Sequence, residues 1–192
     1  MKIISKPYII LRRDWNARNP TDKMNYLSKI NYLVIHHTTF NGDNKIGEYA
    51  KEAVLDIQKY HMSKKYDNQG NLIKNKWADI GYHYLISMDG QIFQGRDINF
   101  QGAHAYGLND KSIGIALLGN FSHKELYPSQ MRSLVHLLAL LKQKYSTPST
   151  NIIGHRDVIN LNPDGTITEC PGIALYSQLS MIRSSVENLL SS

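Results

Sequence analysis

The alternation of apolar and polar positions predicts short buried strands that are separated by amphipathic helices. Apolar runs at 32–39 and 112–119 are short and end in polar or glycine positions, which is typical of buried strands. The segment 151–155 predicts another short strand, which leads into His155. Between 79 and 96 the apolar positions alternate and then break at an Asp-Gly pair, which is a strong signal of a β-hairpin.

Apolar residues at intervals of three and four predict amphipathic helices over 46–64, 128–145 and 174–190. His61 falls at the C-terminal end of the first helix. Ser129 is a candidate N-cap of the second, because a serine side chain can accept a hydrogen bond from a free amide of the first turn.

Together these elements predict one α/β domain, with a central mixed β-sheet flanked by about three helices and a functional groove at the strand ends. Residues 1–30 are expected to form an irregular leader that packs on the domain through Trp15, and 31–192 to form the domain itself. The polar segment 64–76 predicts an exposed loop or a small hairpin. No internal repeat or low-complexity linker divides the chain.

Composition narrows the classes of function. The single cysteine excludes an intramolecular disulfide, so its thiol is a buried apolar group, a nucleophile or a metal ligand. A formal net charge of +6 favours an anionic partner such as nucleic acid, a membrane surface or a bacterial wall. Nucleic acid is disfavoured, because no nucleic-acid motif occurs. The sequence has no membrane-spanning run and no signal-peptide pattern, so we expect neither membrane insertion nor an export signal.

Four candidate metal-binding or catalytic residues follow predicted strands or lie in loops, flanked by Gly, Pro or Thr: His36, His37, His155 and Cys170. Two imidazoles and one thiolate form a ligand set that zinc accepts in catalytic sites, where its fourth position stays open. The alternative is that the cysteine is inert filler and that the paired histidines are one core and one surface residue. The residue types alone leave both interpretations open.

Seven short segments occur in an order that is typical of one family: "VIHHT", "WADIGYHYLIS", "DGQIFQGR", "GAHAYGLN", "SIGIALLGNF", "GHRDV" and "CPG". The chain resembles, from Arg13 to Leu179, the zinc-dependent N-acetylmuramoyl-L-alanine amidases that are related to peptidoglycan recognition proteins and to short phage amidases. The resemblance implies hydrolysis of the amide between N-acetylmuramic acid and L-alanine, with bacterial peptidoglycan as the partner. It also implies action at the cell wall. Without an export signal, release would rely on a holin-type pore or a specialised secretion route, unless a signal peptide was removed beforehand. We expect a monomer.

The resemblance also implies which residues do the chemistry. It implies Zn²⁺ bound by His36, His155 and Cys170, and Tyr82 donating a hydrogen bond to the reacting water or the scissile carbonyl. Thr168 matches a position from which a side chain can donate to a developing oxyanion. No "HExxH" motif is present, so a thermolysin-like peptidase is disfavoured.

Further positions match those that line the muramyl-peptide groove in the recognition proteins: His37, His61, Arg96, His104 and Asn109. For His61 and His104 the alternative is a structural histidine that bonds to loop carbonyls. Asp79 and Asp157 are expected to support the scaffold, with Asp157 orienting His155 or a neighbouring loop.

The chain departs from the family pattern in ways that bear on the site. The segment between His155 and Cys170 is longer than in many members, so zinc ligation requires this loop to fold back. Lys76–Trp77 stands where members selective for diaminopimelate stems have Gly-Trp, which leaves the stem preference open. Two rivals remain: a recognition module that binds peptidoglycan without cutting it, and a basic protein that binds nucleic acid.

Overall fold

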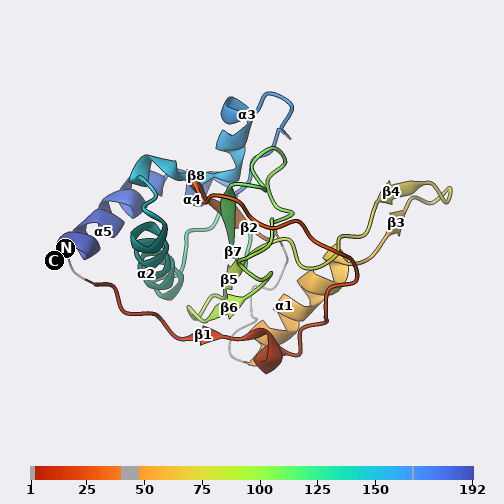
Figure 1. Ribbon diagram of the computed structural model, residues 1–192, viewed down its shortest axis with the longest axis horizontal. Helices are drawn as coiled ribbons and strands as arrows, with labels where there is room; N and C mark the ends of the chain where they lie inside the picture. Colours follow the sequence, from red (N-terminus) through yellow and green to blue (C-terminus); the bar gives the residue numbers. More distant parts are fainter. Residues whose placement is uncertain (1–2, 40–47, 166) are drawn as a thin grey trace.

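The computed structural model describes residues 3–39, 48–165 and 167–192, which fold around a six-stranded sheet (Figure 1). From one edge to the other, the strands are β1 (Ile9–Ile10), β6 (Ile92–Gln94), β5 (Tyr84–Ile86), β7 (Ser112–Leu117), β2 (Tyr32–His37) and β8 (Ile152–Gly154). All neighbours run parallel except β5 and β6, which form the hairpin that the Asp-Gly pair predicted. The predicted mixed sheet of an α/β domain is therefore confirmed.

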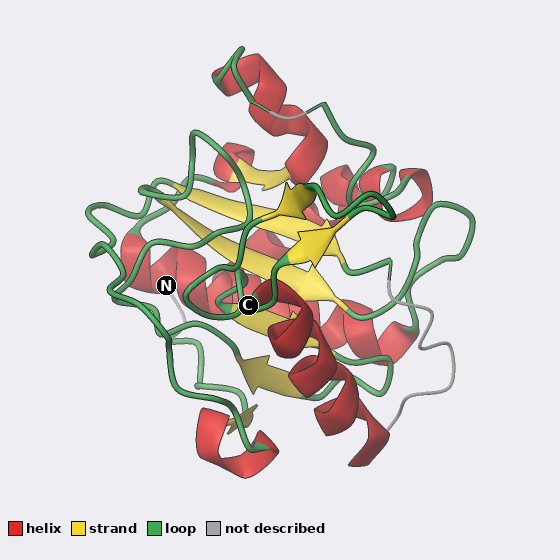
Figure 2. Cartoon of the chain, turned by 90° about the vertical axis from the view of Figure 1, so that its right-hand side faces the viewer, coloured by secondary structure: helices red, strands yellow, loops and turns green. Residues whose placement is uncertain are grey.

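Helices cover both faces of this sheet (Figure 2). The longer ones are α1 (Glu48–His61), α2 (Pro128–Tyr145) and α5 (Leu179–Ser191). Side chains alternate between the two faces of a strand, so Leu33 and Ile35 of β2 pack in the core beneath α2 and α5. On the other face, Leu85 of β5 packs with residues of α1. None of the helices in the described ranges is long and apolar enough to cross a membrane.

Short elements complete the chain: η1 (Arg12–Trp15), β3 (Lys65–Tyr66), β4 (Leu72–Lys74), η2 (Ser149–Asn151), η3 (His155–Asp157), α3 (Val158–Leu161) and α4 (Ile173–Tyr176). Strands β3 and β4 form an antiparallel hairpin that extends away from the body of the protein in Figure 1, so the polar segment 64–76 is a small hairpin. The predicted start of the first helix at 46 lies outside the described residues.

Two helix predictions are wrong in detail. The helix predicted over 174–190 is two helices, α4 and α5, because the Gln178 amide donates to the Leu175 carbonyl three residues back and interrupts the α-helical ladder. Ser129 is not the N-cap of α2, because the helix begins at Pro128 and the Ser129 hydroxyl donates to the Met88 carbonyl instead. That contact ties α2 to the turn of the β5–β6 hairpin.

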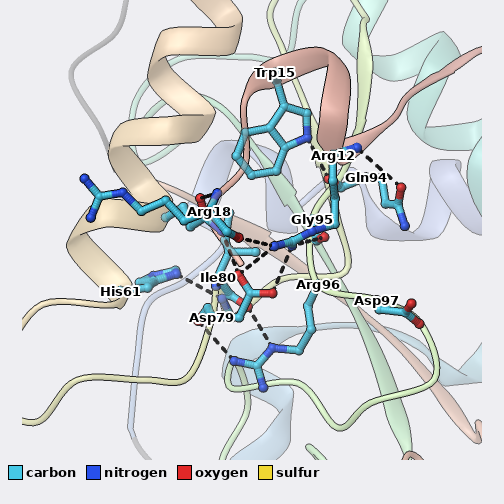
Figure 3. A network of polar contacts seen from close by, with 12 residues as sticks. Arg12, Trp15, Arg18, His61, Asp79, Ile80, Gln94, Gly95, Arg96 and Asp97 are labelled. Carbon is cyan, nitrogen blue, oxygen red and sulfur yellow. Dashed lines mark hydrogen bonds and ion pairs between the residues drawn. The ribbon is translucent and has the colours of Figure 1, made fainter. Parts of the chain in front are cut away.

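The N-terminal leader packs on the domain and contains regular structure, where an irregular segment was predicted. Its strand β1 extends the sheet beside β6. Trp15 is only 1% exposed, and its indole Nε1–H donates to the Gln94 carbonyl at 2.9 Å. The Arg12 guanidinium forms an ion pair with the buried Asp79 carboxylate at 2.9 Å (Figure 3). The leader therefore contacts the segment that precedes Tyr82.

The turn of the β5–β6 hairpin provides a test of the fold. Gly90 has a φ of +86°, and a Cβ there would lie 2.8 Å from the Ser129 carbonyl oxygen. We expect Gly90→Ala to lower the free energy of unfolding by about 1–2 kcal/mol from the left-handed backbone alone, and further from this contact. Gly70→Ala is the matched control, because Gly70 has a φ of +84° but open space around it. Urea unfolding measures the free energy of unfolding of both variants. Equal losses in the two would show that the contact between the new Cβ and the Ser129 carbonyl relaxes.

Candidate metal centre

The candidate metal ligands meet at the C-terminal ends of β2 and β8. His36 is the penultimate residue of β2, and His155 directly follows β8. Because these strands are parallel neighbours, their ends place the two rings 4.5 Å apart, centroid to centroid. Cys170 completes the cluster, and one ligand atom from each of the three residues lies within 4.8 Å of the others. The structure thus brings together the three residues that were predicted to bind zinc.

The long segment after His155 folds back to deliver Cys170. The Arg156 amide donates to the Cys170 carbonyl at 2.8 Å, which joins the two ends of this segment. The Cys170 amide in turn donates to Thr168 Oγ1 at 3.1 Å. Gly172 has a φ of +88°, and a Cβ there would lie 2.4 Å from backbone atoms of Phe121. Only glycine therefore lets the chain pass this close to Phe121 and return to the cluster.

The chemistry of the three donors fits a zinc ion. Tetrahedral zinc with bond lengths of about 2.0–2.3 Å holds its ligand atoms about 3.5 Å apart, and His36 Nδ1 lies 3.7 Å from Cys170 Sγ. Burial lowers the pKa of His36 well below its ordinary value and that of His155 to about 4, so both rings are neutral ligands. Burial raises the pKa of the Cys170 thiol to about 12, so the thiolate form requires a compensating cation. The His37 amide donates to this sulfur at 3.4 Å.

Tyr82 lies beside the cluster of candidate ligands and lines a hollow. Its ring centroid is 5.1 Å from that of His36 and 5.4 Å from that of His61. The hollow has a volume of about 300 Å³ and is lined by Thr38, Thr39, Ile57, Tyr60, His61 and Tyr82. A larger hollow of about 750 Å³, between α2, α5 and residues 3–5, contains none of the candidate ligands. None of the three candidate ligands lines the smaller hollow either; Tyr82 and His61 are the candidate site residues that face it.

Backbone amides define the tautomers of His37 and His61. The Phe121 amide donates to His37 Nδ1 at 3.2 Å, and the Gly81 amide donates to His61 Nδ1 at 3.0 Å. A nitrogen that accepts cannot carry the proton, so each neutral ring holds its proton on Nε2. Burial lowers the pKa of both rings, that of His61 to about 3, so both stay neutral at pH 7. Each ring can therefore donate one hydrogen bond from Nε2.

Three of the predicted groove residues make hydrogen bonds within the protein. The buried Arg96 guanidinium donates to the carbonyls of Ile80 and Asp79 (Figure 3). It also donates to the Gln101 carbonyl. Asn109 Oδ1 accepts the amides of His104 and Ala105. His104 is 7% exposed, and its Nδ1 lies 3.0 Å from His36 Nε2. We therefore infer that Arg96 and His104 support the site, and that Asn109 Oδ1 holds the backbone of His104 in place.

The predicted scaffold carboxylates have different partners. Asp79 Oδ1 accepts from the Gln58 side chain at 2.7 Å and from the Ile80 amide at 2.7 Å, in addition to its ion pair with Arg12. Asp157 accepts from the Gly154 amide at 2.9 Å and from the Tyr176 hydroxyl at 2.6 Å. Asp157 thus orients the loop around His155 and makes no hydrogen bond with the ring.

Two supporting residues, Gln58 and Ser112, escaped the sequence analysis. Gln58 lies on the apolar face of α1 and is fully buried, and Ser112 is a fully buried polar residue at the start of β7. Buried polar side chains require partners, so their positions on apolar faces were the available signal.

Comparison of the chain with known proteins identifies one family. A profile described as N-acetylmuramoyl-L-alanine amidase matches residues 26–173. The chain belongs to this amidase family. The resemblance seen in the sequence is thereby confirmed, and the family match includes all three candidate metal ligands.

The relatives of this amidase-family chain include both recognition proteins and an amidase. Peptidoglycan-recognition protein SC2 of Drosophila simulans is 36% identical over 172 residues, which are 89% of this chain and 84% of that protein. The structure of Drosophila peptidoglycan recognition protein SD matches with a TM-score of 0.76 at 29% identity, over 91% of this chain and 94% of that one. The N-acetylmuramoyl-L-alanine amidase LysC from Clostridium intestinale matches with a TM-score of 0.71 at 30% identity, over 95% and 99%.

Proposed function

We propose that this chain is a zinc-dependent amidase that hydrolyses the amide between N-acetylmuramic acid and L-alanine in bacterial peptidoglycan. The observation that carries the proposal is the cluster of His36, His155 and Cys170, whose ligand atoms lie within 4.8 Å of one another, beside Tyr82. A module that only binds peptidoglycan does not need a complete set of zinc ligands. The complete set therefore favours hydrolysis over recognition alone.

The residues around the cluster supply hydrogen-bond donors. A zinc ion held by the three ligands would act as a Lewis acid that polarises the scissile carbonyl and lowers the pKa of water. Burial raises the pKa of the Tyr82 phenol, so its hydroxyl keeps its proton at neutral pH and can donate a hydrogen bond. As the amide is attacked, its oxygen gains negative charge, which a fixed donor stabilises. Thr168 is a second donor, because its Oγ1 accepts from Cys170 and its own proton is available.

Binding of the muramyl peptide is assigned to the rim of the hollow. His61 lines it, and the Nε2–H groups of His37 and His61 can donate to amide carbonyls of the substrate. The net charge of +6 draws the protein to an anionic wall, so we expect binding to weaken as salt rises. The names of the recognition-protein relatives support peptidoglycan as the partner.

Product analysis tests this function directly. We expect purified sacculi, digested by the zinc-loaded protein, to release stem peptides with a free L-alanine amino terminus and to gain no reducing ends. Mass spectrometry identifies the released stem peptides, and a reducing-sugar assay measures reducing ends. New reducing ends would identify a glycosidase. If neither product forms while zinc and sacculus binding are intact, the protein is a recognition module.

A further inference from the structure

His104 is placed behind a candidate metal ligand instead of in the hollow. Its ring lies edge-on to that of His36, at 5.0 Å between centroids, and its Nδ1 is 3.0 Å from His36 Nε2. The other nitrogen of His36, Nδ1, is the one beside Cys170 Sγ. His36 therefore lies between Cys170 on one side and His104 on the other.

Ser112, which lies beyond His104, determines which atom donates and which accepts in the hydrogen bond between His104 and His36. The Leu108 carbonyl can only accept, so the Ser112 hydroxyl, at 2.6 Å, donates its one proton there. Ser112 Oγ must then accept from His104 Nε2, which lies at a longer distance of 3.5 Å. With its proton on Nε2, His104 has a lone pair on Nδ1 and accepts the proton of His36 Nε2. His36 is thus left with its lone pair on Nδ1, which faces Cys170.

The backbone around His104 leaves space for the ring in this position only because two neighbours are glycine. A Cβ on Gly114, inside strand β7, would lie 2.5 Å from the His104 ring, and a Cβ on Gly102 would lie 2.2 Å from it. Glycine is otherwise unfavourable inside a strand. The two amides that Asn109 accepts hold the backbone of His104 in place.

We infer that His104 is a positioning residue for His36: by accepting the His36 Nε2–H, it keeps the lone pair of Nδ1 directed toward Cys170 and the metal. The inference rests on the proposed zinc site. Ligating histidines commonly donate their second N–H to a carboxylate, carbonyl or water, and loss of such a partner typically costs about 10–100-fold in metal affinity. Here a neutral histidine has that role, and Ser112 and Leu108 determine its tautomer.

Metal titration of the metal-free protein tests the inference. We expect His104→Leu, which fills the space without an acceptor, to weaken Co²⁺ and Zn²⁺ binding about 10–100-fold. His104→Asn should restore most of the affinity, because its Oδ1 can accept where Nδ1 did. Ser112→Ala should weaken binding less, by freeing the His104 tautomer. The control is His136→Asn, because His136 is a histidine of α2 whose ring bonds to the Ser5 carbonyl and lies outside the cluster. Competition with a chromophoric chelator and the cobalt–thiolate absorption band measure affinity.

Each outcome decides the inference. Wild-type affinity in His104→Leu overturns it, as do equal losses in His104→Leu and His104→Asn. If His104→Leu does not fold, Ser112→Ala decides, and affinity equal to that of His136→Asn overturns the inference.

A measurement without metal separates this inference from the proposed function. Nitrogen-15 NMR of the metal-free protein should show both His36 and His104 protonated on Nε2, and protonation of either on Nδ1 contradicts the hydrogen-bond chain. A wild-type protein that binds zinc and shows these tautomers but cleaves no peptidoglycan would refute the hydrolase and leave the role of His104 intact.

Discussion

Cys170→Ser is expected to abolish tight zinc binding and, with it, the hydrolysis of peptidoglycan. A serine hydroxyl stays protonated where a thiol can become a thiolate, and it is a poor ligand for zinc. The loss should exceed the 10–100-fold that removal of an outer-shell partner typically costs, because a ligand itself is removed. Elemental analysis of protein purified without added metal gives the zinc content, and release of stem peptides from sacculi gives the activity.

The matched control is a histidine outside the cluster. His123→Ser removes an exposed potential ligand and should leave zinc content and activity unchanged. Because Cys170 is the only cysteine, a thiol reagent reports on it alone, and we expect the wild-type thiol to react only after a chelator removes the metal. Full zinc content in Cys170→Ser, or a reactive thiol in the zinc-loaded wild type, would contradict the ligand assignment.

Tyr82→Phe is expected to lower kcat about 10²-fold while zinc content stays at the wild-type level. Phenylalanine keeps the ring that packs beside His36 and His61, so the change removes a single hydroxyl from the edge of the hollow. That hydroxyl is protonated at neutral pH and is the donor assigned to the developing oxyanion. Steady-state kinetics on a soluble muramyl peptide, with zinc measured on the same samples, separate a chemical defect from metal loss.

Tyr84→Phe is the control for this change. Tyr84 is also partly buried, but it packs against the core beneath α2 and α5, on the side away from the cluster, and burial raises its pKa to about 12. Its substitution should leave kcat unchanged. An unchanged kcat in Tyr82→Phe would remove Tyr82 from the mechanism, and equal losses in both variants would indicate a general effect of hydroxyl removal.

The sequence predicted the elements whose apolar pattern is local and regular. Helix α2 spans Pro128–Tyr145, as the spacing of its apolar residues predicted, and strand β2 carries His36 and His37 to its end. Where the pattern was interrupted by contacts from elsewhere, the predictions failed. Serine is a residue type that favours the N-cap position, but the Ser129 hydroxyl donates to the Met88 carbonyl, which is distant in the sequence.

Within the site, the sequence by itself determined the ligand types and the family. His36, His155, Cys170 and Tyr82 each lie in a short motif whose order along the chain is sufficient to identify the relatives, and the structure brings all four together. The same motifs assigned Arg96, His104 and Asn109 to the groove, because a motif records that a polar residue is present and does not record what it contacts.

Only the tertiary structure decided how these polar atoms are used. The contact between His36 and His104 joins residues 68 positions apart, and that between His36 and Cys170 joins residues 134 apart. A hydrogen bond depends on the position and protonation of both partners to within a few tenths of an ångström, and the packing of the β2 and β7 ends sets those positions. Local periodicity determines which face of a strand His36 occupies. Which nitrogen of His36 is available to a metal depends instead on the donor and acceptor roles in the series of hydrogen bonds that joins Leu108, Ser112, His104 and His36.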